Sequence, residues 1–594
     1  MTTPHLILVS LGPVQDFIAQ ARRTRDLWFG SHLLSELSRA AAKALAIQGT
    51  ELIFPALGKD DPEFEACDEP TRPGRDIPPL SIANKLLAEA PAGIDPSGCV
   101  RAARGAVQDR WRGIAGRVRS KRHNVLAANI DDVWYEQIDD VLEFYAVWVP
   151  LGSDYITARK TVEQALAGRK NLRDFRAWQV TRDGAPKSSL DGARVSVLPR
   201  NQDRTHPDFR RFGIRPGEQL DAVGLVKRTG FEPDRFIPLV NVAAGDWLHR
   251  AQQAAPRELL AVAAACKDKK ISAIDRNMSV IRPFRFDASV LYPSRWPTLF
   301  SELEVTEAPD AAREWGEQHI RPLLDAMRSE PPSYVACLVA DGDRMGKAID
   351  ILDTPEANRQ FSRALAKFPQ RARTIVESDH CGSLVYAGGD DVLAFLPVAT
   401  AFACARALAE AFRAALKDTV PPAQTPTLSV GIGIGHVLDS MASLLQRGKD
   451  AERAAKDAGR NALAVIVDKR SGGQRQFAQS WDLDPVSRIA KDAVLLDDAL
   501  ATGKVHALEA LLKRFPAPAT VTAETSAMAA AFICYANDLL AHTGETASKV
   551  SLRDFATVTE HGDYGALHAE VAASIDRLLS VRLMREAGYD GKGI

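Results

Sequence analysis

The sequence predicts an α+β fold that contains two ferredoxin-like modules, each with the element order β-α-β-β-α-β. Short apolar runs of strand length alternate with longer stretches whose apolar residues recur at helical spacing. The same order of runs occurs near the start of the chain and again after about residue 331. The 594 residues are enough for about three to five domains, each with its own core.

The first module is expected over residues 1–155 and is of the palm type found in polymerases and nucleotide cyclases. A segment rich in Pro, Asp and Gly separates its two short inner strands. The predicted elements are a strand at 5–11, a long helix at 13–47, strands at 51–56 and 80–87, a charged helix at about 100–140 and a strand at 143–151.

The second palm-like module is expected over residues 331–475. A mixed, mainly helical middle region (156–330) precedes it, and a C-terminal helical domain (476–594) follows it. Its predicted elements are a strand at 334–340, a helix at 355–378, two short strands within 383–397, a helix at 400–417, a strand at 427–435, a helix at 441–458 and a strand at 463–467.

Composition limits the function classes. The chain has 75 Lys and Arg against 76 Asp and Glu, and this net charge of -1 excludes a general basic coat for nucleic acid while leaving room for a local basic groove. No two of the seven cysteines lie closer than 23 residues, so no Cys-x-x-Cys zinc or redox motif exists. Scattered cysteines and the absence of 18 consecutive apolar residues favour a cytoplasmic protein without a membrane span.

Four aspartates of the second module are candidate metal ligands. Asp341 and Asp343 follow its first strand, and Asp390 and Asp391 lie in the turn between its second and third strands. These strands are neighbours in a palm, so the carboxylates are expected to converge. Carboxylate oxygens suit Mg²⁺ or Mn²⁺, and two such ions about 4 Å apart can activate a ribose hydroxyl and stabilise a leaving pyrophosphate. We therefore predict Asp341, Asp390 and Asp391 as catalytic residues, and all four as metal ligands.

Five further residues of this module are candidates for nucleotide contact. Gly388 and Gly389 suit a tight hairpin turn, and their missing side chains allow a base or phosphate to approach the backbone. Lys456, Arg460 and Asn461 lie near the last predicted strand, where a cation can neutralise triphosphate charge. The alternative to nucleotide contact is that the glycines belong to a solvent-exposed hairpin turn and that Lys456 is a solvent-exposed helix residue.

The first module has the same element order as the second but lacks the aspartates of the second. Aligning Gly12 with Gly342 places Leu11 and Pro13 where the second module has its aspartates, so no catalytic metal is expected there. Palm cyclases work as face-to-face pairs, so this module can still form half of a nucleotide pocket. Gly30 and Ser31 are its candidate contacts, with helix packing as the alternative.

Six segments resemble the large subunit of type III-B (Cmr) CRISPR effector complexes, the CRISPR-associated protein ten family. They follow the family's order across nearly the whole chain. They are LGPVQDFIAQARRTRDLWFGSHLLSEL (11–37), RKNLRDF (169–175), LDAVGLVKR (220–228), VADGDRMGKAI (339–349), YAGGDDVLAFLP (386–397) and AKDAGRNAL (455–463).

The resemblance implies a subunit of an RNA-guided complex that polymerises ATP into cyclic oligoadenylate when target RNA binds. Its partners would be other Cmr-type subunits, guide RNA, target RNA and ATP. The family's metal-holding aspartates correspond to Asp390, Asp391 and Asp341, and its triphosphate lysine corresponds to Lys456.

Two departures from the family pattern carry expectations. Many relatives begin with an HD nuclease domain, whereas here the first palm strand starts at His5 and no adjacent His-Asp pair occurs, so we expect no DNase activity. Relatives also carry a four-cysteine zinc site before the segment at 220–228. Residues 199–216 contain no cysteine, so no structural zinc is expected.

Three basic clusters are candidate RNA-phosphate contacts: Arg22-Arg23-Arg25, Arg169-Lys170-Arg173 and Lys227-Arg228. Two other functions stay open from the sequence. A free-standing diguanylate cyclase shares the palm and the Gly-Gly-acid-acid hairpin, and a catalytically silent scaffold subunit would keep only the fold.

Overall fold

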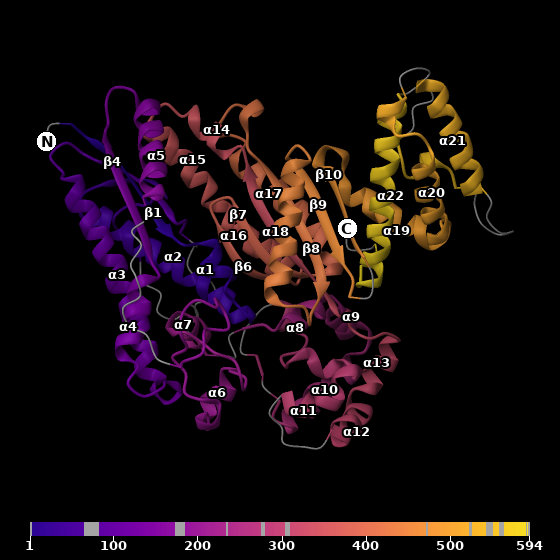
Figure 1. Cartoon of the computed structure of the whole chain (residues 1–594), viewed down its shortest axis with the longest axis horizontal. Helices are drawn as coiled ribbons and strands as arrows, with labels where there is room; N and C mark the ends of the chain where they lie inside the picture. Colours follow the sequence, from indigo (N-terminus) through magenta and orange to yellow (C-terminus); the bar gives the residue numbers. More distant parts are fainter. Residues whose placement is uncertain are drawn as a thin grey trace.

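The computed structural model describes residues 3–64, 82–172, 184–232, 236–271, 273–274, 279–302, 309–470, 473–521, 525–541, 550–557, 563–589 and 591. Two β-sheets form the body of the molecule, with the first sheet at the left of Figure 1 and the second in the centre. The last helices lie at the right, and the helices α8 to α13 of the middle region lie below the second sheet. The predicted α+β class with two sheets is confirmed.

The first sheet has the strand order β2-β3-β1-β4, which is the ferredoxin-like order, and its three pairings are antiparallel. Helices α1 to α4 contribute to the core on one face, and α5 packs against the apolar side chains of the other. The elements are β1 (His5–Gly12), α1 (Gln15–Ala19), α2 (Thr24–Ile47), β2 (Glu51–Phe54), β3 (Lys85–Ala90), α3 (Pro96–Lys121), α4 (Asp131–Asp140), β4 (Glu143–Pro150) and α5 (Tyr155–Asn171).

The single helix predicted at 13–47 is wrong, because it divides into α1 and α2. The backbone N–H groups of Arg22 and Arg23 donate to the Asp26 carboxylate (3.0 and 3.1 Å), which fixes the start of α2. The ammonium group of Lys227 binds the carbonyl oxygens of Phe17 and Gln20 at the end of α1 (2.5 and 2.6 Å). A local side chain, Asp26, and one that is distant in sequence, Lys227, therefore set this break. The predicted helix at 100–140 likewise divides into α3 and α4. The third strand begins later than predicted, and residues 80–81 of that prediction lie outside the described residues.

The second sheet has the order β10-β9-β8-β5-β7-β6, so the ferredoxin-like set β6-β7-β5-β8 gains two strands. β9 runs parallel to β8, and β10 is antiparallel to β9. The elements are β5 (Tyr334–Asp343), α14 (Met345–Asp350), α15 (Pro355–Leu365), α16 (Lys367–Arg373), β6 (Ser383–Gly388), β7 (Asp391–Pro397), α17 (Val398–Leu416), β8 (Thr427–His436), α18 (Met441–Asp457), β9 (Ala462–Asp468) and β10 (Gln474–Ser480).

Two of these elements differ from the sequence prediction. The helix predicted at 355–378 divides into α15, α16 and a π-helical segment. Strand β10 was not predicted, because only Phe477 of its seven residues is buried and its sequence, QRQFAQS, is polar. It extends the sheet beyond residue 475, where the helical domain was expected to begin.

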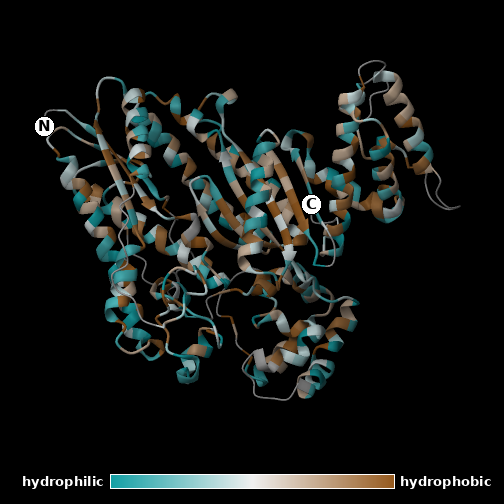
Figure 2. Cartoon of the chain, viewed as in Figure 1, coloured by the Kyte–Doolittle hydropathy of each residue, from teal (hydrophilic) through white to brown (hydrophobic). Residues whose placement is uncertain are grey.

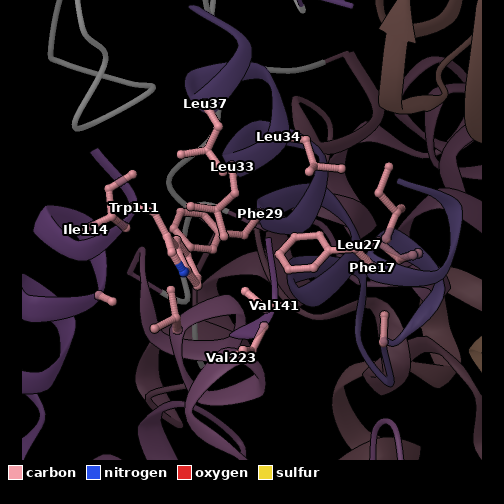
Figure 3. Close-up of a cluster of buried hydrophobic side chains, with 14 of the residues drawn as sticks. Phe17, Leu27, Phe29, Leu33, Leu34, Leu37, Trp111, Ile114, Val141 and Val223 are labelled. Carbon is pink, nitrogen blue, oxygen red and sulfur yellow. The ribbon is translucent and has the colours of Figure 1, made fainter. Parts of the chain in front are cut away.

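The two sheets share a hydrophobic core. Val335 and Cys337 on one face of β5 belong to the same buried cluster as the side chains of α2 and α3. Figure 3 shows the first-module part of this cluster, where α2 contributes Phe29 and Leu33 beside Trp111 of α3. On the other face of β5, Ala336 and Leu338 pack with the helices α15 to α17. The central strands of the second sheet are accordingly hydrophobic in Figure 2.

Two smaller hydrophobic cores are built without the strands of either sheet. The middle region contains α6 (Pro207–Arg211), α7 (Ala222–Thr229), α8 (Leu239–Ala243), α9 (Gly245–Ala254), α10 (Pro256–Asp268), α11 (Trp296–Glu302), α12 (Pro309–His319) and α13 (Arg321–Met327). The C-terminal helices are α19 (Pro485–Asp498), α20 (Thr502–Arg514), α21 (Thr525–Ala541) and α22 (Tyr564–Glu586). Within the described ranges, every helix is too short or too polar to cross a membrane.

Candidate active site

The acidic residues lie where the central strand of the second sheet ends. β5 pairs with β7 on one side and with β8 on the other. Ala340 of β5 lies opposite Val392 of β7, so Asp341 and Asp391 are the next residues along these two neighbouring strands. The strand order thus brings together acids that are about 50 residues apart in the sequence, as the palm pattern predicted.

The turn between β6 and β7 requires its glycines. Gly388 pairs with Asp391, which leaves Gly389 and Asp390 as the two turn residues. Gly389 has a φ of +66°, and positive φ at the first central position is a feature of type II′ hairpin turns. A Cβ atom on Gly388 would lie 2.2 Å from the hydroxyl oxygen of Tyr386. Tyr386, which the sequence analysis did not single out, thus packs under the turn.

The carboxylates crowd one another, and Asp390 and Asp391 hold their protons more tightly than usual. Burial and the charge of Asp341 raise the pKa of Asp390 to about 6. Desolvation in the site, the Asp390 charge and a hydrogen bond with Asp341 raise the pKa of Asp391 well above its ordinary value. The Asp391 residue as a whole stays exposed, so we ascribe its raised pKa mainly to the two neighbouring carboxylates. A divalent cation would relieve this repulsion.

Lys456 is the cation of this site. Its ammonium group lies 2.5 Å from Asp341 Oδ2 and 2.6 Å from Glu452 Oε1. Burial lowers the pKa of Lys456, but these two carboxylates raise it overall. The lysine reaches Asp341 because α18 lies directly on β8: a Cβ atom on Gly431 would lie 2.0 Å from the backbone nitrogen of Glu452.

Asp343 has a different environment from the other three aspartates. It is 1% exposed and accepts hydrogen bonds from the hydroxyl groups of Thr427 and Ser429 (both 2.8 Å) and from the backbone N–H of Asn461 (2.9 Å). These donors occupy both carboxylate oxygens, so the geometry favours a structural role and does not support the predicted metal contact. The sequence predicted Asp343 as a metal ligand beside Asp341 because both follow the same apolar run, and its partners Thr427, Ser429 and Asn461 are remote in sequence.

Asn461 links this site to the neighbouring surface. Its side chain donates to Asp482 (3.1 Å) and accepts from Arg413 (3.1 Å), and it is held in the left-handed region with a φ of 47°. Arg460, with a φ of 67°, is exposed. The contacts of Asn461 explain its identity without a nucleotide.

The donor types of the site suit Mg²⁺ or Mn²⁺, because Asp341, Asp390 and Asp391 offer hard oxygen atoms. In the part of the chain that the structure describes, no three Asp, Glu, His or Cys side chains are already arranged around a metal position. The raised pKa of Asp390 and the Lys456 ammonium group on Asp341 are consistent with a site that a cation would rearrange.

Comparison with known proteins gives two matches to family models. Residues 334–464 match the second palm domain of Cas10/Cmr2, and residues 6–116 match the N-terminal domain of the CRISPR-associated protein Cmr2. Both modules therefore contain regions that are similar to Cas10/Cmr2 proteins. The resemblance seen in the sequence is thereby confirmed.

One curated relative is similar to the chain in sequence, and two solved structures are similar to it in fold. The Cmr2 subunit of the CRISPR system Cmr of Pyrococcus furiosus is 25% identical over 575 residues, with 81% of this chain and 63% of the relative covered. The chain therefore spans less than two thirds of that relative. The fold matches a chain of the type III-B Cmr-beta structure in the apo state (TM-score 0.67, 13% identity, 98% of this chain and 82% of the other). The corresponding structure with cognate target RNA gives a TM-score of 0.67 at 12% identity, covering 98% and 83%.

The first palm-like module borders the second at the hairpin turn. Leu11, which stands where the second module has Asp341, is 3% exposed and packs in the core. A Cβ atom on Gly389 would lie 3.9 Å from the Phe54 ring at the end of β2. The Ala56 backbone N–H also donates to the Ser362 hydroxyl (3.0 Å). The two palms therefore meet beside the acidic residues.

Gly30 and Ser31 are buried within α2 of the first palm. A Cβ atom on Gly30 would lie 3.0 Å from the Lys227 side chain, so the glycine permits α7 to pack against α2. This observation supports the helix-packing alternative. Their nucleotide contact stays a prediction.

The basic clusters differ in their exposure. Lys227 and Arg228 are 2% and 0% exposed, so the prediction that they contact RNA phosphates is wrong. The buried charge of Arg228 is compensated by Asp26 and Glu218. The Lys227 ammonium group binds backbone carbonyl oxygens instead.

Two basic clusters retain exposed members. Arg22 is exposed, whereas burial and neighbouring arginines lower the pKa of Arg25 to about 9. Lys170 is exposed, and Arg169 stacks on the Tyr145 ring at 5.6 Å. Arg173 lies outside the described residues.

Proposed function

We propose that this chain is the palm subunit of a type III-B CRISPR effector complex and that it joins adenylate units from ATP when the complex binds target RNA. The main observation behind this proposal is that Asp341, Asp390 and Asp391 converge at the ends of neighbouring strands, with Lys456 beside them. The raised pKa values of Asp390 and Asp391 support a site made for a cation. Cyclic oligoadenylate or a related adenylate messenger is the proposed product.

The three aspartates would hold Mg²⁺ or Mn²⁺. When bound, the two ions would activate a ribose hydroxyl of one nucleotide and stabilise the pyrophosphate leaving from another. Lys456 is placed to bind triphosphate oxygens once it leaves Asp341. The absence of side chains at Gly388 and Gly389 lets a base or phosphate approach the turn, with Phe54 of the first palm nearby.

Guide RNA, target RNA and other Cmr-type subunits are the proposed partners. The net charge of -1 indicates that this chain does not hold RNA alone. We infer that neighbouring subunits hold most of the RNA and that exposed cations such as Arg22 and Lys170 add local phosphate contacts.

The test is ATP turnover by the assembled complex with target RNA and Mn²⁺. Labelled ATP should give a phosphodiester product and pyrophosphate, and mass spectrometry should identify an adenylate product. In the double variant Asp390→Ala/Asp391→Ala, the rate of product formation should fall about 1000-fold or more, because metal stabilisation of the transition state is worth several kcal/mol. Asp457→Asn, an exposed acid at the end of α18, is the matched control and should keep its activity.

Other outcomes would replace this proposal. GTP consumption by the isolated chain without RNA would instead identify a diguanylate-cyclase-like enzyme. Intact complexes that give no product with either nucleotide would identify a silent scaffold subunit.

A further inference from the structure

Lys456 bridges carboxylates from two different elements. Its ammonium group binds Asp341 at the end of β5 and Glu452 one turn earlier in α18. The Glu452 side chain is 15% exposed, half as much as the lysine and Asp341 side chains, which are each 30% exposed. Glu452 is therefore the most enclosed member of this ionic triad.

The backbone of Glu452 has a fixed position over the sheet. Gly431 of β8 allows its nitrogen to come within the space that a Cβ atom would fill. Glu452 Oε1 is buried without a geometrically suitable hydrogen bond, so the ion pair with Lys456 is its compensation. The Glu452 side chain therefore contacts Lys456 from a backbone position that is fixed by the packing of α18 on β8.

The position of Lys456 conflicts with cation binding. Asp341, whose Oδ2 the lysine contacts, is one of the carboxylates that would hold the proposed divalent ion. The ammonium group must leave Asp341 when the ion arrives, and Glu452 is the acid that can keep it beside the site. Without Glu452, the lysine would have Asp341 as its remaining partner in the triad.

We propose that Glu452 is a positioning residue that acts through Lys456. It draws the ammonium group away from Asp341, so that a divalent cation can bind there while the lysine stays available for triphosphate. This inference rests on the proposed function, because it assumes that Asp341, Asp390 and Asp391 hold the cation. Two other roles for Glu452 are a direct metal ligand and a general negative charge.

The experiment is a double-mutant cycle read out as Mn²⁺ binding, by calorimetry on the purified full-length chain without ATP. The four proteins are wild type, Glu452→Gln, Lys456→Met and the double variant. Removing the lysine should strengthen Mn²⁺ binding, since the competing cation is gone. In the presence of Lys456, Glu452→Gln should raise the dissociation constant for Mn²⁺. When Lys456 is absent, the fold-increase in that dissociation constant should be about fivefold smaller.

The sign of the coupling decides between the roles. If Glu452 is a metal ligand or only a nearby charge, its loss has an equal or larger effect without the lysine, and that result overturns the inference. Asp457→Asn measures the effect of removing a nearby exposed charge, and its effect should be the same in both backgrounds. Thermal unfolding of each variant confirms that the chain still folds.

A further variant separates failure of this inference from failure of the proposed function. Asp390→Ala should remove the Mn²⁺ binding of the wild type. If the wild type shows no binding that depends on Asp390, the metal site itself is refuted, and the inference about Glu452 falls with it. If that binding exists, the coupling measured between Glu452 and Lys456 tests only the proposed role of Glu452.

Discussion

Two clusters of carboxylates in this molecule have opposite electrostatic environments, and only the first of them is fully buried. At the junction of α2 and α7, Asp26 and Glu218 both bind the guanidinium group of Arg228. At the edge of the second sheet, Asp390 and Asp391 lie beside a third carboxylate, and the lysine of the site binds Asp341 and Glu452 instead. The first cluster is compensated within the fold, whereas the second is not.

The pKa values record this difference. Burial by itself would raise the pKa of Asp26 and Glu218, but Arg228 lowers both below their ordinary values. Burial and like charge raise the pKa of Asp390 to about 6. A compensated carboxylate holds the structure together, and an uncompensated one is available for a ligand. The comparison therefore separates a structural ionic cluster from the proposed metal site without reference to sequence motifs.

The largest expected effect is on the compensated cluster. Arg228→Leu should lower the free energy of unfolding by about 3–5 kcal/mol at pH 7, because it leaves two buried carboxylates without their cation. Urea unfolding measures this loss. Arg22→Leu, at an exposed position nearby, should change stability by less than about 0.5 kcal/mol. Equal effects of the two substitutions would contradict the assignment of Arg228.

The uncompensated cluster should respond in the opposite direction. Asp390→Asn should stabilise the metal-free chain by about 1–3 kcal/mol at pH 8. The folded-state pKa is above the ordinary value of 3.8, so the wild type loses stability as pH rises from about 4 to about 6. The advantage of the variant should therefore be complete above about pH 6 and disappear below about pH 4. A destabilised variant at pH 8 would show that Asp390 is compensated after all.

A smaller effect concerns the pH dependence of metal binding. Mn²⁺ needs ionised carboxylates, so its affinity should rise about tenfold per pH unit up to about pH 6 for the proton of Asp390, and less steeply above. The raised pKa of Asp391 should add to proton release in the same direction. Calorimetry in buffers of different ionisation enthalpy counts the released protons. An affinity independent of pH between 5 and 6 would contradict the raised pKa.

The main part of the candidate site could be predicted from local sequence. The apolar strand before Asp341 and the hairpin glycines before Asp390 are short-range patterns, and the ferredoxin-like order places the two strands side by side. Strand β10 escaped prediction because its pairing with β9 comes from backbone hydrogen bonds and not from an apolar pattern. Glu452 was missed because its partner Asp341 lies on another element.

By itself, the sequence determined the two β-α-β-β-α-β modules, the loss of acids from the first and the position of the acidic turn in the second. Only the tertiary structure decided which charged residues are compensated. It buried Lys227 and Arg228 against α1 and α2, and it tied Asp343 to Thr427, Ser429 and Asn461. The physical reason is that the strength of an ionic contact depends on the distance and burial of both partners, and residues remote in sequence set these quantities.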